Sequence, residues 1–435
     1  MPAKTPPGFD AFMGNGGGDY TAPRFAVSGL ADVGPWGIQD GSWKGTQHNY
    51  TTAVVGNVSI AWIEKTVAAQ HPFFAYIAPK AAHEPFIPAP WHLDHWDDSW
   101  PATEPRDNPA WNCSAALRAD KHGNIATNPM ISSDAATVIT GIFKNRWRTL
   151  MSVDDVIGAV IDKCEALGVL NNTYFFYTSD HGFQLGQFNM LMDKRHVYDW
   201  DTRIHLLARG PGIAAGSTWS QPATQVDLAP TFLGIAGLGK TAVMDGKSLV
   251  PLLVTGGAAA AAAPLHLATA RHLAALGPAD KYAAGWRDAA FIEYYFVAPN
   301  VKCVQTCEKV GGKFNNWPHA DSWCTDLPNN DKCWSPVCKT DCYPTEDENN
   351  NFIALRHPDA SGAFGNTLYA EFQHGNADKA AVNFSAGDVN FHEYYDASAD
   401  KWQMHNLFNA TSQATLDALH TKLHDAFNCA GDACP

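Results

Sequence analysis

A run of aromatic and β-branched residues, Thr173-Tyr-Phe-Phe-Tyr-Thr-Ser179, leads directly into Asp180-His181-Gly182. An apolar run of this length without polar alternation predicts a short buried strand, and the glycine marks a tight turn at its end. Ligands of open parallel sheets collect at the carboxyl ends of the strands. The sequence therefore predicts that Asp180 and His181 stand at a ligand site.

Comparable segments lie on both sides of this run. Residues 73–78 and 204–209 are also short apolar runs, and residues 49–70, 134–167 and 226–238 show helical periodicity or composition. Short apolar strands that alternate with helices are typical of a parallel sheet covered on both faces. We therefore expect residues 1–255 to form one α/β domain with a mostly parallel sheet.

The character of the chain changes after residue 255. Residues 256–284 begin with an alanine tract and predict an insertion or linker, while residues 285–435 carry aromatic runs and most of the cysteines. The aromatic runs suggest antiparallel strands joined by bridged loops, followed by a helix near residues 415–427. We expect a small disulfide-rich α+β domain at the carboxyl end.

Composition excludes several classes of partner. The 435 residues include 44 acidic and 30 basic side chains, giving a formal net charge of −14. Nucleic acids and anionic membrane surfaces require clustered Lys and Arg, so neither is expected as the main partner. No apolar run approaches the roughly 20 residues that span a bilayer. Oligomeric state stays open.

Cysteines and glycosylation sequons indicate the secretory pathway. Eight of the ten cysteines lie in the last third, six of them between Cys303 and Cys342. An even, clustered set favours disulfides over a zinc site, since no Cys-x₂-Cys pair occurs, but the pairing stays open. Six residues begin Asn-x-Ser/Thr triplets: Asn49, Asn57, Asn112, Asn171, Asn383 and Asn409. We expect a lysosomal or extracellular protein, although the start at Met1 lacks a signal peptide.

Cationic side chains form a second candidate cluster. Asp193-Lys194-Arg195-His196 is a compact basic patch in an acidic chain, and His83 follows the apolar run at residues 73–78. An Asp and a His after a strand can hold a metal, and nearby Lys and His side chains can bind an anion, as a phosphate or sulfate ester requires. Each piece also has a structural alternative, namely a capped turn, a loop histidine and a solvated basic loop.

Six further motifs follow one another along the chain. They are Phe143-Lys-Asn-Arg-Trp-Arg-Thr-Leu-Met-Ser-Val-Asp-Asp155, Tyr177-Thr-Ser-Asp-His-Gly-Phe-Gln-Leu-Gly-Gln-Phe188, Asp193-Lys-Arg195, Leu206-Leu-Ala-Arg-Gly-Pro-Gly212, Asp227-Leu-Ala-Pro-Thr231 and Asp245-Gly-Lys-Ser-Leu-Val-Pro-Leu-Leu253. With these motifs the chain resembles the catalytic domain of the sulfatases, which belong to the alkaline-phosphatase-like superfamily. The likeness is greatest to glucosamine-6-sulfatases and related arylsulfatases, and it extends to the cysteine pair in Asn428-Cys-Ala-Gly-Asp-Ala-Cys434.

The resemblance implies hydrolysis of a sulfated sugar or aryl sulfate ester by a formylglycine nucleophile beside a calcium ion. It makes Asp180 and His181 two of the calcium ligands and Lys194 a catalytic contact to the sulfate, with Arg195 adding positive charge. It makes His83 a catalytic residue that hydrogen-bonds the sulfate or assists the leaving oxygen. Cationic groups and a divalent ion would together offset the charge that builds on the ester oxygens.

The nucleophile motif of this family, Cys-x-Pro-x-Arg, is missing from the sequence. The nearest match, Cys342-Tyr-Pro-Thr-Glu346, carries Glu in place of Arg and is expected to hold a disulfide half-cystine. Asp154-Asp155 lies in a helical pattern and does not supply the metal-binding pair of the family. We therefore expect the chain to be a fragment that aligns from partway through the catalytic domain and has no appreciable sulfatase turnover.

Two other functions remain open at this point. One is a phosphatase or phosphodiesterase of the same superfamily, although the second-metal ligands of those enzymes are not recognisable here. The other is a noncatalytic secreted glycoprotein that keeps the fold and binds sulfated glycans. An in-frame Cys-x-Pro-x-Arg upstream of Met1 would favour the enzyme.

Overall fold

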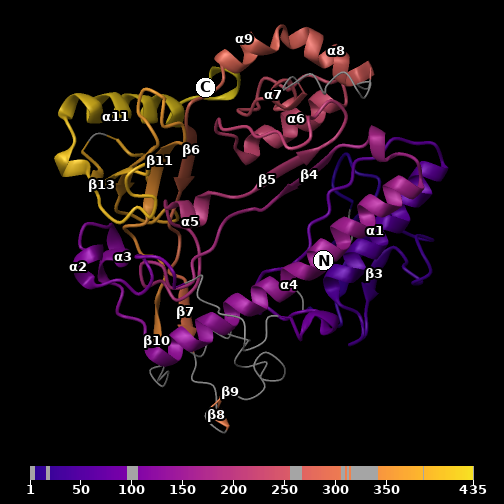
Figure 1. Cartoon of the computed structure of the whole chain (residues 1–435), viewed down its shortest axis with the longest axis horizontal. Coiled ribbons are helices and arrows are strands. Elements are labelled where there is room, and N and C mark those ends of the chain that lie inside the picture. The colour runs from indigo at the N-terminus through magenta and orange to yellow at the C-terminus, as the bar shows by residue number, and fades with distance from the viewer. Residues whose placement is uncertain are drawn as a thin grey trace. The chain divides into compact units, whose positions relative to one another are not determined.

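The computed structural model describes residues 5–15, 20–95, 106–254, 267–304, 309–310, 313–314, 341–385 and 387–434. The chain divides into two compact units. Unit 1 comprises residues 1–103, 137–171 and 305–329, and unit 2 comprises residues 104–136, 172–304 and 330–435. Figure 1 shows the helices and strands of both units.

Unit 1 packs a small antiparallel sheet against a helix. The sheet has the order β1-β2-β3, formed by β1 (Phe12–Asn15), β2 (Arg24–Ser28) and β3 (Gly41–Lys44). Phe25 and Val27 of β2 share a buried cluster with Val58 of helix α1 (Thr51–Ala68). The helix predicted over residues 49–70 is confirmed.

The long helix α4 (Ser133–Ala166) runs beside α1 (Figure 1). Lys163 of α4 lies 3.3 Å from Glu64 of α1, and Val156 of α4 faces Gly56 of α1. Asp155 lies inside α4 as predicted, where its Oδ2 accepts hydrogen bonds from the side chains of Trp91 and His92. The unit also contains the short helix η1 (Pro90–His92) and the strand pair β8 (Lys309–Val310) and β9 (Lys313–Phe314).

Unit 2 is built on a four-stranded antiparallel sheet in the order β13-β12-β11-β6. Its strands are β6 (Ala290–Tyr294), β11 (Asn351–His357), β12 (Thr367–Gln373) and β13 (Val389–Asp396). Alternate residues point to opposite faces of a strand. Phe352 and Phe372 accordingly pack with Phe188 and Tyr198, whereas Tyr369 packs with Leu419 of helix α11 (Gln413–Phe427). The predicted antiparallel strands and carboxy-terminal helix are confirmed.

The strand predicted at residues 173–179 is β4 (Phe175–Thr178), and the one predicted at 204–209 is β5 (Leu206–Arg209). They pair with each other antiparallel, not parallel. A parallel pair needs a crossover, usually a helix. The segment between these strands carries only the four-residue helix α5 (Asp199–Thr202), so the chain returns in the opposite direction.

Burial of these apolar runs is lower than predicted. Leu207 of β5 is 62% exposed, and Tyr76 within residues 73–78 is 77% exposed. Residues 73–78 form no strand, and in the described part of the chain no strand pairs with them. A short apolar run identifies a segment suited to burial, but it does not supply the neighbouring strand or helix that would cover it.

Unit 2 also contains short helices, and Figure 1 shows α6 (Leu228–Ile235), α7 (Val250–Val254), α8 (Leu267–Leu276) and α9 (Ala279–Ala284) as one group. Residues 267–284 of the predicted linker form α8 and α9, and the alanine tract before them lies outside the described residues. The remaining elements are α2 (Ala115–Arg118), α3 (Gly123–Thr127), η2 (Leu170–Asn172), η3 (Gln225–Asp227), β7 (Val301–Val304), β10 (Asp341–Pro344), η6 (Phe408–Ala410) and η7 (Gly431–Ala433).

One disulfide joins Cys429 and Cys434 in the described residues, and Cys113 and Cys164 are free and buried. The side chains of the six cysteines between Cys303 and Cys342 lie outside the described part of the structure. None of the helices in the described ranges combines the length and the apolar composition needed to cross a bilayer.

Candidate functional site

Asp180 and His181 form an exposed turn directly after β4. Asp180 Oδ1 accepts the backbone N–H of His181 at 3.1 Å and the Ser179 hydroxyl at 3.3 Å, while the Asp180 side chain is 81% exposed. No helix follows the turn, so Asp180 is not the helix cap that the structural alternative supposed. Both side chains are open to a ligand from solvent.

Two backbone hydrogen bonds fix this turn against residues 200–201. The Gly182 N–H donates to the Asp201 carbonyl at 2.7 Å, and the Phe183 N–H donates to the Trp200 carbonyl at 2.9 Å. A Cβ atom at Gly182 would lie 2.0 Å from the Trp200 oxygen. Gly182 is therefore required by the contact that fixes Asp180 and His181 in place.

The geometry of His181 suits a cation. Its Nδ1 lies 2.7 Å from the Gly182 carbonyl, and because a carbonyl only accepts hydrogen bonds, we assign the ring proton to Nδ1. Nε2 then has a lone pair, and it lies 3.2 Å from Asp180 Oδ2, a second acceptor. A cation shared by the two acceptor atoms relieves this approach. The pair fits part of the shell of a divalent cation, since calcium takes about six to eight ligands, mostly oxygen.

The basic loop is anchored by a buried carboxylate. Asp193 has no exposed surface, and its Oδ2 accepts hydrogen bonds from Arg195 at 2.6 Å, Asn300 at 3.0 Å and Thr345 at 3.1 Å. The Lys194 Nζ lies 3.5 Å from Asp193 Oδ1. The charge of Asp193 thus holds both basic side chains of the loop.

Lys194 lies beside the Asp-His-Gly turn. Its Nζ is 5.9 Å from the centroid of the Phe183 ring, and Phe183 follows Gly182 directly. Its side chain is 19% exposed. The structure therefore brings Lys194 next to the turn that carries Asp180 and His181, as the predicted anion site requires.

The Arg195 side chain forms ion pairs within the protein. Its guanidinium bonds Asp193 at 2.6 Å and lies 3.6 Å from Glu346. Burial acts to lower the pKa of Arg195, but the charges of Asp193 and Glu346 outweigh it and the pKa is raised. Two carboxylates thus hold the Arg195 charge, and its predicted contact to substrate stays a prediction.

A buried histidine network adjoins this loop. His196 Nε2 donates to the Thr345 carbonyl at 2.7 Å, and burial, reinforced by His122, lowers the pKa of His196 to about 3. His122 Nδ1 donates at 2.8 Å to Glu393, which has no exposed surface. Sequence reasoning missed this network. The one available signal was a single carboxylate in the aromatic run Phe391-His-Glu-Tyr-Tyr395.

His83 belongs to unit 1 and is described there by itself. It is exposed, its Nδ1 lies 3.0 Å from the Glu84 carbonyl, and its own carbonyl accepts the Tyr20 hydroxyl at 2.6 Å. The Tyr20 hydroxyl thus fixes the loop backbone while the His83 ring stays accessible.

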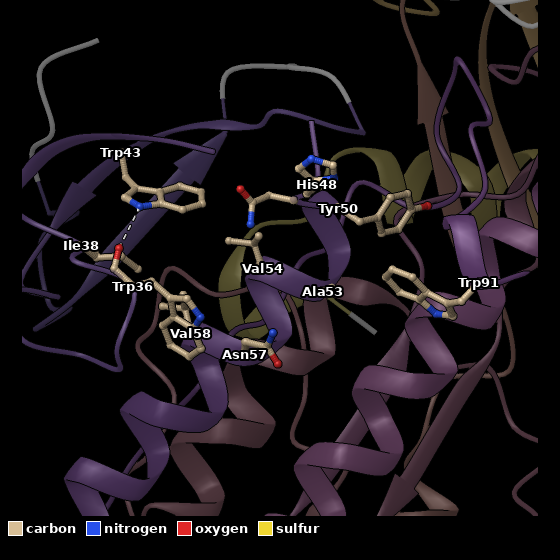
Figure 2. Close-up of a pocket in the computed structure, with 11 residues that line it drawn as sticks. Trp36, Ile38, Trp43, His48, Tyr50, Ala53, Val54, Asn57, Val58 and Trp91 are labelled. Atoms are coloured by element: carbon tan, nitrogen blue, oxygen red, sulfur yellow. Dashed lines mark hydrogen bonds between the residues drawn. The ribbon is translucent and has the colours of Figure 1, made fainter. Parts of the chain in front are cut away.

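A small cavity of about 150 Å³ in unit 1 contains none of the predicted catalytic or metal residues (Figure 2). Its walls are mainly aromatic and aliphatic, with His48 and two amides as polar groups, and no Asp, Glu, Lys or Arg lines it. It therefore offers neither carboxylates for a metal nor a permanent positive charge for an anion.

Comparison with known proteins decides the family. The sequence model of the Sulfatase family matches residues 4–238, more than half of the chain. The chain belongs to the sulfatase family. The predicted alkaline-phosphatase-like α/β fold is confirmed with it.

Two relatives illustrate the extent of the likeness. N-acetylglucosamine-6-sulfatase of Homo sapiens is 31% identical over 391 residues, which cover 89% of this chain and 57% of that protein. The extracellular sulfatase SULF-1 homolog of Drosophila melanogaster is 43% identical over 114 residues, 26% of this chain and 10% of that protein. The chain thus spans a little over half the length of the N-acetylglucosamine-6-sulfatase that it matches.

The solved structure of BT4656 in complex with its substrate D-glucosamine-2-N, 6-O-disulfate gives a TM-score of 0.59 at 22% identity. The aligned region covers 97% of this chain and 76% of the BT4656 chain. At this identity the likeness shows the sulfatase fold. Sulfatases generally use a divalent metal, and the assignment of Asp180 and His181 to it stays a prediction.

Proposed function

We propose that the protein acts on the sulfate ester of a sulfated amino sugar, with the 6-sulfate of N-acetylglucosamine in glycosaminoglycans as the first candidate and an aryl sulfate as the second. One observation carries the proposal. The Lys194 Nζ lies 5.9 Å from the ring centroid of Phe183, two residues after His181, so a cationic group approaches the turn that carries the candidate metal ligands in an acidic chain. The similarity to N-acetylglucosamine-6-sulfatase supports the choice of sugar.

The residues have distinct proposed roles. Asp180 and His181 hold a calcium ion, which when bound supplies positive charge next to the ester oxygens. Lys194 donates hydrogen bonds to a sulfate oxygen, and its ion pair with Asp193 restricts the positions of the Lys194 side chain. His83 contacts the sulfate or the leaving oxygen through its exposed ring. Arg195 is paired with Asp193, and its partly exposed side chain is a proposed substrate contact.

These 435 residues are not expected to complete the reaction by themselves. No cysteine of the chain is followed by the x-Pro-x-Arg pattern that supplies the formylglycine nucleophile. We therefore propose that the chain binds the sulfated sugar and releases no sulfate. A noncatalytic glycan-binding protein with the sulfatase fold is the second candidate, and the missing nucleophile is the observation that favours it.

The metal proposal predicts a calcium affinity that depends on Asp180. Calorimetric titration with Ca²⁺ is expected to show weak binding, and Asp180→Asn is expected to weaken it at least about tenfold, because it removes the charged oxygen ligand. Asp162→Asn changes an exposed carboxylate of α4 and serves as the control. Equal calcium affinity in the Asp180 and Asp162 variants would refute the assignment.

A lysosomal or extracellular location is proposed from the sequons and predicts a pattern of N-glycans. Asn57, Asn171, Asn383 and Asn409 are exposed, whereas both ends of the Asn112 amide bond the Ile131 backbone, at 2.7 and 3.1 Å. Glycopeptide mass spectrometry of the chain expressed through a eukaryotic secretory pathway is expected to find glycans at the exposed sites and not at Asn112. A fully occupied Asn112 with bare exposed sites would contradict the pattern.

A further inference from the structure

A second set of metal-ligand side chains lies on the face of the large sheet that α11 covers. His420 and His424 are four residues apart on α11, so they project from the same side of the helix. Glu371 comes from β12, in the same layer as Tyr369, which packs against α11. The cluster therefore joins the carboxy-terminal helix to the sheet of unit 2 (Figure 1).

The three side chains converge on one point. His420 Nδ1 lies 2.6 Å from Glu371 Oε1, and His424 Nε2 lies 2.9 Å from Glu371 Oε2. One ligand atom from each residue can be chosen so that all lie within 4.8 Å of one another. In the described part of the chain no other three His, Cys, Asp or Glu side chains meet this condition.

The cluster can be reached from solvent. The Glu371 side chain has no exposed surface, while the His420 and His424 side chains are 49% and 22% exposed. An ion can therefore reach the Glu371 carboxylate past the two partly exposed rings.

We propose that Glu371, His420 and His424 bind a zinc ion. Two imidazoles and one carboxylate are a ligand set that zinc uses with a fourth position open to water, at metal–ligand distances of about 2.0–2.2 Å. Nitrogen ligands favour zinc over calcium and magnesium. The site is distinct from the Asp180–His181 turn, so two different ions would bind the two places.

Neighbouring groups orient the ligands. The Tyr369 hydroxyl donates to Glu371 Oε1 at 2.7 Å, whereas Oε2 pairs with His424 Nε2, a contact that an ion shared by these two atoms would replace. His392 is opposite Glu371 in the β12–β13 register, but its ring stacks on Phe408 at 4.4 Å between centroids. The fourth position is therefore assigned to water.

Zinc titration of the full chain, purified in chelator and then freed of it, tests the proposal. Wild type is expected to bind one more Zn²⁺ than the double variant His420→Ala/His424→Ala, and each single variant is expected to bind that ion at least about 100-fold more weakly. His405→Ala removes an exposed histidine elsewhere and is expected to bind like wild type. Co²⁺ in the site is expected to show visible d–d bands without a thiolate charge-transfer band, because no cysteine takes part.

Unfolding temperatures measured in chelator show whether the variants fold. If His424→Ala does not fold, the zinc affinity of His420→Ala tests the proposal, since His420 is the more exposed ligand. Zinc is also expected to raise the unfolding temperature of wild type and of His405→Ala more than that of the double variant. Equal zinc stoichiometry and affinity in wild type and double variant would overturn the proposal, as would a wild type that binds no zinc. In those cases the cluster is a hydrogen-bonded anchor for α11.

Discussion

Single residues show how much of the candidate site can be predicted from the sequence. Asp180 and His181 come just after the recognisable strand β4, so their position at its end could be predicted from the chain order, while their roles and that of Lys194 stay predictions. Asp193 and Glu393 could not be recognised as anchors, because their partners Thr345 and His122 lie 152 and 271 residues away in sequence. Only the fold reveals which charges of a basic loop are neutralised from within.

Asp201 gives a residue-scale prediction about pH. Its carbonyl holds Gly182, its Oδ2 accepts the His196 N–H at 2.7 Å and the Gln184 amide at 3.0 Å, and burial raises its pKa from 3.8 to about 8. When the pKa of a group is higher in the folded state, its contribution to stability is fully present at pH values below the pKa of the unfolded state. That contribution is lost as the pH rises towards the pKa of the folded state.

The variant Asp201→Asn keeps both acceptor contacts and cannot ionise. Its free energy of unfolding relative to wild type is expected to rise with pH between about 4 and 8, by at most about 1.4 kcal/mol per pH unit, and then level off. Urea unfolding at a series of pH values measures this difference. A difference that does not change with pH would contradict the buried, protonated state of Asp201.

At the scale of elements, the helices were predicted better than the sheet. The periodicity of residues 49–70 and 134–167 located α1 and α4 to within about two residues, because helical hydrogen bonds are local. The apolar runs located β4 and β5 but not their antiparallel pairing, which depends on the connection between them. Residues 73–78 have the same composition as a buried strand and remain half-exposed, since burial depends on neighbours.

The packing of α1 against α4 predicts opposite effects for two glycines. A Cβ at Gly56 would lie 2.5 Å from Val156 Cγ2, and a β-branched side chain has little freedom to move away. Overpacking costs about 1–3 kcal/mol and exceeds the helix-propensity gain of about 1 kcal/mol, so Gly56→Ala is expected to lower the free energy of unfolding.

Gly158 of α4 is the matched control. A Cβ there would meet no atom within 4 Å, so Gly158→Ala is expected to raise the free energy of unfolding by about 0.5–1 kcal/mol. Urea unfolding of both variants gives the comparison. If Gly56→Ala were as stabilising as Gly158→Ala, the close contact between α1 and α4 would be wrong.

For the whole molecule, the motif order and the fold agree on the sulfatase family, while the nucleophile motif is missing from these 435 residues. Fold and family were predictable because they rest on many residues spread along the chain. The substrate is a proposal, because it depends on a few side chains around one sulfate. The proposal that the chain binds the sulfated sugar without releasing sulfate can be tested by measuring binding and turnover on the same sample.

Binding of N-acetylglucosamine 6-sulfate by the chain in the presence of Ca²⁺ tests the central claim most directly. Calorimetry is expected to show binding of the sulfated sugar but not of N-acetylglucosamine, weakened at least about tenfold by Lys194→Ala and unchanged by Lys65→Ala, an exposed lysine of α1. Ion chromatography of the same samples is expected to find no released sulfate. Equal affinity of wild type and Lys194→Ala, or sulfate release by the chain, would contradict the account.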